Sequence, residues 1–291
     1  MERLLYSRAL RWWTILRIAL EERMVYRGDF ALGTLMRFLP IITQIFLWWT
    51  IFETIGAEQE TEHPEIEGFS FHDMVAYYLL TMLSRAFSSM PGLASGIALQ
   101  IRNGEIKKFI IQPVDLVGFL LLNRIAHKIA YYSVAFGPFL IVFTLCWWGG
   151  YFDSVSLPWT TWMAFLASLI MGFLIGFFLE TAIGMIGFWF LEVSSLLFVY
   201  MLLSFFLSGH MFPLTMLPDN EIIGRLSYRT IVDMLPLKYL AYFPAAICLE
   251  TVKGDDLIRG LWIEAGWLVF FMVMCRAMYA AGLRRYSGYG G

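Results

Sequence analysis

Residues 159–191 read WTTWMAFLASLIMGFLIGFFLETAIGMIGFWFL, and Glu180 is the one charged residue in this run. Thirty-three residues of α-helix measure about 50 Å, whereas the hydrocarbon core of a bilayer is about 30 Å thick. The run therefore predicts a membrane-spanning helix that begins at Trp159 and continues past Gly176, followed by a turn between Gly184 and Glu192.

The rest of the chain has the same apolar character. Of its 291 residues, 59% are hydrophobic and 15% are charged, and the mean hydropathy is +0.67. Soluble domains carry about 25% charged residues. The composition therefore excludes a soluble enzyme, a disordered chain and a collagen. The net charge of −2 offers no basic excess to a phosphate backbone, so we expect no nucleic-acid partner.

Five further segments are long and apolar enough to cross a bilayer, which takes about 20 residues. These predicted spans are Phe30–Phe52, Phe71 to about Met90, about Val117 to Trp148, about Val193 to Phe212, and about Leu261 to Ala281. The expected fold class is all-α integral membrane, with six transmembrane helices in one domain.

Helix-breaking residues gather between the fifth and sixth predicted spans. Gly209, Pro213 and Pro218 stop the fifth helix. The apolar stretch that follows contains Pro236 and Pro244 together with two charges, which makes it a poor span. We expect short helices there that enter the outer leaflet and return.

The basic residues are distributed unevenly among the predicted loops. Residues 1–29 hold six Lys and Arg, residues 91–128 hold five, and the carboxy-terminal tail holds three. Loops 53–70 and 149–158 hold none. Because cytoplasmic loops carry the excess of Lys and Arg, we expect both termini in the cytoplasm.

Motifs for nucleotide binding and hydrolysis are absent from the sequence. No lysine is followed by Ser or Thr after a glycine-rich loop, so no Walker A motif exists. Neither H-E-x-x-H nor G-x-S-x-G occurs. The three cysteines and four histidines lack metal-ligand spacing. We therefore expect no catalytic residue, no metal and no cofactor in this chain.

The predicted cytoplasmic loop reads IRNGEIKKFIIQPVD from Ile101 to Asp115. Its apolar residues alternate with charges, which predicts a short amphipathic helix broken at Gly104 and ended by Pro113. Two roles are open for it. Its lysines can lie at phospholipid headgroups, or the helix can dock into a groove of a soluble subunit.

The amino-terminal segment is also amphipathic. Leu5, Trp12 and Leu16 recur at helical spacing with arginines between them, which predicts a helix along the inner membrane interface. Simple anchoring explains this helix as well as a functional role does.

Four ionisable residues fall inside predicted spans, namely Arg37, Arg85, Glu180 and Glu264. Charges in a bilayer are costly and are usually paired or functional. Arg37 and Arg85 reach the depth of Glu180, so one reading is an ion cluster in the inner leaflet. The other is that both arginines extend to the headgroups, with Glu264 at the outer interface.

Taken in order, these segments resemble the permeases of ATP-binding-cassette transporters of the second exporter class, the ABC-2 family. The likeness covers nearly the whole chain. It lies in the amino-terminal helix leading into YRGDF, the loop RNGEIKKFIIQPV, the external motifs SGHMFPL, LP and YFPA, and the tail GLRRYSGYGG.

The resemblance implies a division of the chain. Residues 1–29 would be a cytoplasmic connecting helix, and residues 30–283 the six-span domain. Within that domain, 98–116 would be a coupling loop and 213–258 an external re-entrant segment, with 284–291 as a cytoplasmic tail. The residues implied to contact an ATPase are Ile101, Arg102, Asn103, Gly104, Glu105, Ile106, Lys107, Lys108 and Phe109.

The resemblance also implies partners. Two ATP-binding-cassette subunits would hold ATP and Mg²⁺, and a second six-span permease, identical or homologous, would complete the pathway. The assembly would lie in a bacterial cytoplasmic (inner) membrane, with substrate leaving along spans one, two and five. The residues implied to form the outer gate are Gly209, Pro213, Pro218, Pro236 and Pro244.

Two other classes of function compete with an exporter permease. A stand-alone secondary transporter or channel needs a midplane charge pathway or broken helices in corresponding halves. A membrane enzyme needs paired catalytic groups. Spans rich in Phe, Trp and Met suit a lipid or hydrophobic cargo, and they suit packing against lipid equally well.

Overall fold

The computed structural model describes residues 2–25, 27–59, 64–112, 114–152, 155, 158–190, 192–217, 221–223 and 226–286. Pro113, Pro218 and the tail residues 287–291, about which the sequence makes predictions, lie outside the described residues. The long α-helices are α1 (Glu2–Val25), α2 (Arg27–Gln59), α3 (Phe71–Ser88), α6 (Leu116–Trp148), α7 (Trp159–Met185), α8 (Ser194–Leu207) and α11 (Gly254–Arg285). The short elements are α4 (Leu93–Arg102), α5 (Lys107–Ile111), α9 (Tyr228–Met234), α10 (Tyr242–Cys248), the 3₁₀ helices η1 (Ile186–Phe188), η2 (Leu214–Met216) and η3 (Pro236–Leu240), and strands β1 (Glu221–Ile223) and β2 (Leu226–Ser227).

The chain is an all-α membrane protein. Among the described residues, four helical segments are long and apolar enough to cross a bilayer: Ala31–Glu58, Leu116–Trp148, Trp159–Phe188 and Gly254–Arg285. The predicted second and fifth spans correspond to α3 and to α8, which is too short on its own to cross about 30 Å. The six-span count therefore stays a prediction.

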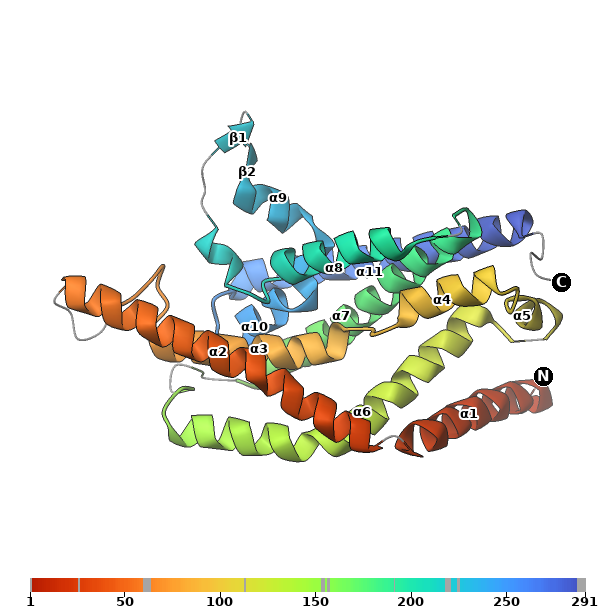
Figure 1. The fold of residues 1–291 in the computed structure, drawn as a ribbon, viewed down its shortest axis with the longest axis horizontal. Coiled ribbons are helices and arrows are strands. Elements are labelled where there is room, and N and C mark those ends of the chain that lie inside the picture. Colours follow the sequence, from red (N-terminus) through yellow and green to blue (C-terminus); the bar gives the residue numbers. More distant parts are fainter. Residues whose placement is uncertain are drawn as a thin grey trace.

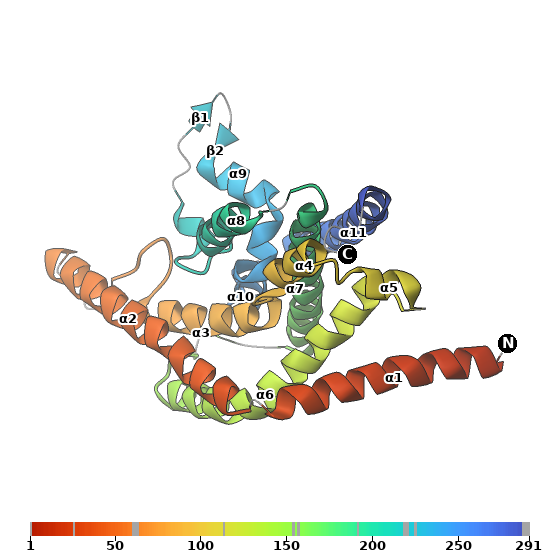
Figure 2. The same ribbon diagram turned by 45° about the vertical axis from the view of Figure 1, so that its right-hand side comes forward.

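The end that carries α5 also carries both termini of the described chain (Figures 1 and 2). α1 packs along the first half of α6, where the Trp12 ring lies against Gly118. α6 then bends, as Figure 1 shows, and contains Pro138, which cannot donate a backbone hydrogen bond. The bend directs the second half of α6 away from α1.

The predicted second span, Phe71 to about Met90, corresponds to the continuous helix α3, and a turn follows it. α3 ends at Ser88 and α4 begins at Leu93, with Gly92 at a φ of 70° between them. Glycine adopts this left-handed conformation without the penalty that a Cβ brings. α4 then continues toward α5, so a short helix of about 15 Å joins the loop to α3.

Helix α7 is the central element, packed on α11, α3, α4, α10 and η3. One face carries Ser168, Gly172, Gly176, Glu180 and Gly184, each four residues apart. Residues at this spacing share a face of an α-helix, and small residues let backbones approach closely inside membranes. We call this row the α7 stripe.

The α7 stripe admits neighbouring backbone directly. A Cβ at Gly172 would lie 2.8 Å from the Tyr239 carbonyl oxygen, and one at Gly184 would lie 2.8 Å from that of Ala94. At Gly176 a Cβ would overlap the Ser88 carbonyl oxygen. The stripe therefore determines where η3, α3 and α4 meet.

The segment between α8 and α11 contains short helices between Thr230 and Leu249, as the sequence predicts. Every residue of α10 is buried, and α10 packs against α3 and α7. The antiparallel strands β1 and β2 project from the bundle with α9 (Figure 2). α11 begins at Gly254, earlier than the sixth predicted span, so residues 254–258 are helical.

We predict that Gly176→Ala lowers the thermal unfolding midpoint of the purified protein. The added methyl group must displace the Ser88 backbone, and overpacking of this kind costs about 1–3 kcal/mol. Gly137→Ala is the matched control, because no atom lies within 4 Å of a Cβ there. An unchanged midpoint in Gly176→Ala would contradict the close approach.

Candidate functional site

The loop at the end that holds both termini folds back on the chain. α4 ends at Arg102, Gly104 has a φ of 73°, and α5 begins at Lys107. Ile101, Ile106 and Phe109 are 5%, 0% and 7% exposed, and the Phe109 ring centroid lies 5.2 Å from that of Phe119.

This burial corrects one expectation from the sequence. The apolar residues Ile101, Ile106 and Phe109 were expected to form the partner-facing side of the loop, but they pack inside the chain. The apolar side chains on the surface are Ile110 and Ile111, which are 52% and 81% exposed. The alternating pattern cannot distinguish a face covered by the chain's own α6 from a face left for a partner.

The exposed polar residues of the loop are Arg102, Asn103, Glu105, Lys107 and Lys108. Lys108 Nζ lies 3.4 Å from Glu105 Oε2, and Arg102 Nη1 lies 3.7 Å from Glu192 Oε2 in the α7–α8 connection. Exposed pairs of this kind stabilise by about 0–1 kcal/mol. The loop therefore presents a basic surface beside the exposed Ile110 and Ile111.

Asp115 fixes the end of the loop to two helices. Its Oδ2 accepts a hydrogen bond of 2.7 Å from the Gly118 N–H and caps α6, and its Oδ1 accepts one of 2.5 Å from Arg276 in α11. Partial burial raises the pKa of Asp115, but the hydrogen bonds from Arg276 and Gly118 outweigh it and hold the pKa below its usual value.

A second group of polar side chains surrounds the turn between α3 and α4. Lys128 Nζ, in α6, donates to the carbonyls of Ala86 and Ser89, the latter at 2.7 Å. Arg124 Nη1 donates to the Pro91 carbonyl at 2.9 Å, and the Glu180 carboxylate lies close to the backbone of Met90. Helix ends leave backbone groups without intrahelical partners, and Lys128 and Arg124 satisfy the carbonyls among them. We call this group the hinge cluster.

The hinge cluster contains one of the predicted intramembrane charges, Glu180, and lies near two others. Arg85 lies within electrostatic range of Glu180 and Arg37. The Arg37 guanidinium also lies 5.1 Å from the centroid of the Tyr131 ring. Arg124 and Lys128 were counted from the sequence as loop charges, yet α6 contains both and Lys128 is 8% exposed. Their spacing of four residues was the signal that one helix face carries them.

The fourth predicted charge lies elsewhere. Glu264, for which the outer interface was one reading, is fully buried between α11 and α7, where Ser168 Oγ donates to its Oε1 at 3.2 Å. Within the described part of the chain, its Oε2 has no hydrogen-bond partner. The early start of α11 places Glu264 in the third turn of the helix.

α3 holds the segment that contains the helix-breaking residues named from the sequence. The Tyr77 hydroxyl donates to the Gly209 carbonyl, and Ser88 Oγ donates to the Leu240 carbonyl at 2.7 Å. Pro213 precedes η2, Pro236 begins η3, and Pro244 lies within α10. No group of three or more metal-ligating side chains gathers among the described residues.

The fold and these sites define a multi-pass, all-α membrane protein with a basic loop at the end that carries both termini. A family model for ABC-2 family transporter proteins matches residues 38–290. The chain belongs to the ABC-2 transporter family, the membrane-spanning proteins of ATP-binding-cassette transporters. A search of curated proteins found no match.

We predict that Lys128→Met destabilises the protein by about 1–3 kcal/mol, because two backbone carbonyls at the end of α3 lose their charged donor. Lys107→Met, at an exposed position of the loop, is the control and should leave stability unchanged. Thermal unfolding of both variants in one detergent measures the difference. Equal midpoints would show that Lys128 does not support the turn.

A second prediction concerns pH. Because the pKa of Asp115 is lowered in the folded state, its carboxylate stabilises the fold above the ordinary pKa of about 3.9. That stabilisation is lost as the pH falls through the folded-state pKa. Asp115→Ala should cost about 1–2 kcal/mol at pH 7, and its deficit relative to the unmodified chain should shrink toward pH 3. Melting curves across this range test it, and a pH-independent deficit would count against the charged contact.

Proposed function

We propose that this chain is the membrane-spanning permease subunit of an ATP-binding-cassette exporter. In this proposal it forms half of a translocation pathway, and two separate ATPase subunits supply the energy. The family match supports this assignment. The observation that carries the coupling mechanism is the position of the loop, whose exposed basic residues and isoleucines lie at the end that holds both termini.

The proposed orientation follows from the basic residues at that end. Cytoplasmic placement of the loop agrees with the positive-inside distribution of Lys and Arg. α3 with α4 would be the second span and α8 the core of the fifth, which gives six crossings. α1 would be the connecting helix, and the external segment from η2 to α10 would cap the outer mouth. A second six-span permease in a bacterial inner membrane would complete the transporter.

The proposed mechanism transmits motion from the loop to the outer mouth. ATP and Mg²⁺ would bind to the ATPases, whose closure would displace the loop and α4. The hinge cluster holds the turn between α3 and α4 against α6, so this displacement would reach α3. α3 holds the external segment through Tyr77 and Ser88. This mechanism requires that the ATPase binds the chain with different affinity before and after the displacement of the loop and α4.

We predict that Ile111→Asp abolishes copurification of the ATPase subunit with this chain. Ile111 is 81% exposed, so the change leaves the fold intact, whereas burial of an isoleucine at an interface contributes about 2 kcal/mol, or roughly thirtyfold in affinity. Arg284→Glu, exposed at the same end of the chain, is the control. Ile106 and Phe109 are poor test positions because they are buried.

The measurement is affinity purification of the tagged chain, coexpressed with the ATPase, followed by mass determination of the complex. We expect two ATPases per pair of permeases for the unmodified chain and for Arg284→Glu, and free permease for Ile111→Asp. Unchanged binding by Ile111→Asp would refute this docking surface. Reconstitution tests the wider proposal, because a chain that transports cargo unaided in vesicles would be a secondary transporter or channel.

A further inference from the structure

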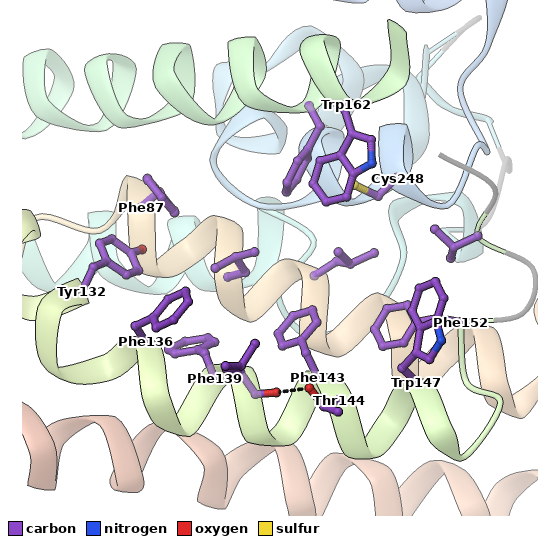
Figure 3. Close-up of a pocket in the computed structure, with 15 residues that line it drawn as sticks. Phe87, Tyr132, Phe136, Phe139, Phe143, Thr144, Trp147, Phe152, Trp162 and Cys248 are labelled. Atoms are coloured by element: carbon purple, nitrogen blue, oxygen red, sulfur yellow. Dashed lines mark hydrogen bonds between the residues drawn. The ribbon is translucent and has the colours of Figure 1, made fainter. Parts of the chain in front are cut away.

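An apolar groove lies between the second half of α6 and the helices α3 and α7 (Figure 3). Its volume is about 630 Å³, and Cys248 of α10 closes part of it. Aromatic side chains form most of its wall, among them Phe87, Phe136, Phe143 and Trp162. The bend of α6 leaves this space open between α6 and α7.

The groove offers almost no polar contact along its length. The Thr144 hydroxyl already donates to the Leu140 carbonyl at 2.7 Å, within its own helix. The Tyr132 hydroxyl, at one end, is buried and has no hydrogen-bond partner among the described residues. Trp147 and Trp162 lie toward the other end (Figure 3). An occupant must therefore be apolar throughout, with one acceptor group near Tyr132.

The groove is long and apolar. Tyr132 and Trp147, which lie toward its two ends, are 15 residues apart in α6, which corresponds to about 22 Å of helix. An apolar groove of this length along one helix suits a hydrocarbon chain that lies parallel to α6.

The groove opens sideways to the surface of the helix bundle. Phe136, Leu140 and Trp162 are 66%, 54% and 42% exposed. They lie on helices apolar enough to span a bilayer, so the surrounding medium at this depth is hydrocarbon. Lys128 and Trp148 are about 30 Å apart along α6, which equals the thickness of the hydrocarbon core. With these two residues at the two edges of the core, Tyr132 lies one helical turn inside the edge nearer to the termini.

We propose that this groove binds one acyl chain of a bilayer phospholipid from the leaflet nearer to the termini. The ester carbonyl of the lipid accepts a hydrogen bond from the Tyr132 hydroxyl, and the chain lies along α6 toward Trp147 and Trp162. The positive charge of Arg37, whose guanidinium lies 5.1 Å from the centroid of the neighbouring Tyr131 ring, favours a phosphate headgroup at this end. The lipid is a resident of the fold, and this inference goes beyond the proposed transport function.

The test uses the full chain in nanodiscs of phosphatidylglycerol that carries a photoreactive diazirine on one acyl chain. Labelled peptides are then mapped by mass spectrometry. We expect label on residues 132–147 and 162–165 well above that on α8, whose apolar side chains are also exposed to lipid. Thr144→Trp, which fills the groove, should reduce this label several-fold. Leu145→Trp, a neighbour that is 59% exposed and outside the groove, should not.

A second variant tests the anchor. Tyr132→Phe removes the hydroxyl and keeps the ring, and it should lower phospholipid retention after delipidation about fivefold, the equivalent of one hydrogen bond. Label spread evenly over α8 and the groove would overturn the proposal, as would an unchanged pattern in Thr144→Trp. A photoreactive amino acid at position 144 that crosslinks to protein instead of to phospholipid would overturn it too. Thermal unfolding of each variant confirms that the fold is intact.

Discussion

The close approach of backbone to the α7 stripe is the constraint on which the rest of the structure depends. A side chain at Gly172, Gly176 or Gly184 would separate α7 from η3, α3 and α4. Close backbone contact creates a second requirement, because it buries the polar groups of the turn between α3 and α4. Glu180 stands in the same row as the glycines, and Lys128 and Arg124 of α6 donate hydrogen bonds to carbonyls of the turn. The glycines therefore allow the close contact between backbones, and the charged side chains bind the backbone groups that this contact buries.

The sequence predicts the apolar helices well, because a run of uncharged residues in a bilayer has one stable conformation. It predicts the break at Gly104 and the short external helices for a similar local reason, since glycine and proline restrict the backbone directly. It predicts the end of the second span near Met90, but it does not predict the separate helix α4 between that end and the loop.

The sites were predicted less completely, since their geometry depends on contacts between distant residues. Lys128 lies 39 residues from Ser89, whose carbonyl it binds, and Arg276 lies 161 residues from Asp115. The sequence does not show that Glu264 is buried, because its burial depends on how α11 packs against Ser168 of α7. The loop shows the same difficulty, since alternation identifies an apolar face but not which surface covers it. Phe119 covers Phe109, and nothing in a pattern of residues 101–115 indicates this contact.

The arrangement suits the proposed transmission of motion from the loop to the segment that follows α8. α4 is a short helix held against α7 at Gly184. Side chains of α6 in the hinge cluster hold the turn between α3 and α4, and α3 binds the segment that follows α8 at Gly209 and Leu240. Packed helices move as rigid bodies more readily than they deform. In the proposed mechanism, a displacement of α4 would reposition the turn, and through α3 the segment that follows α8, or would break buried hydrogen bonds of the hinge cluster at a cost of about 1–3 kcal/mol each.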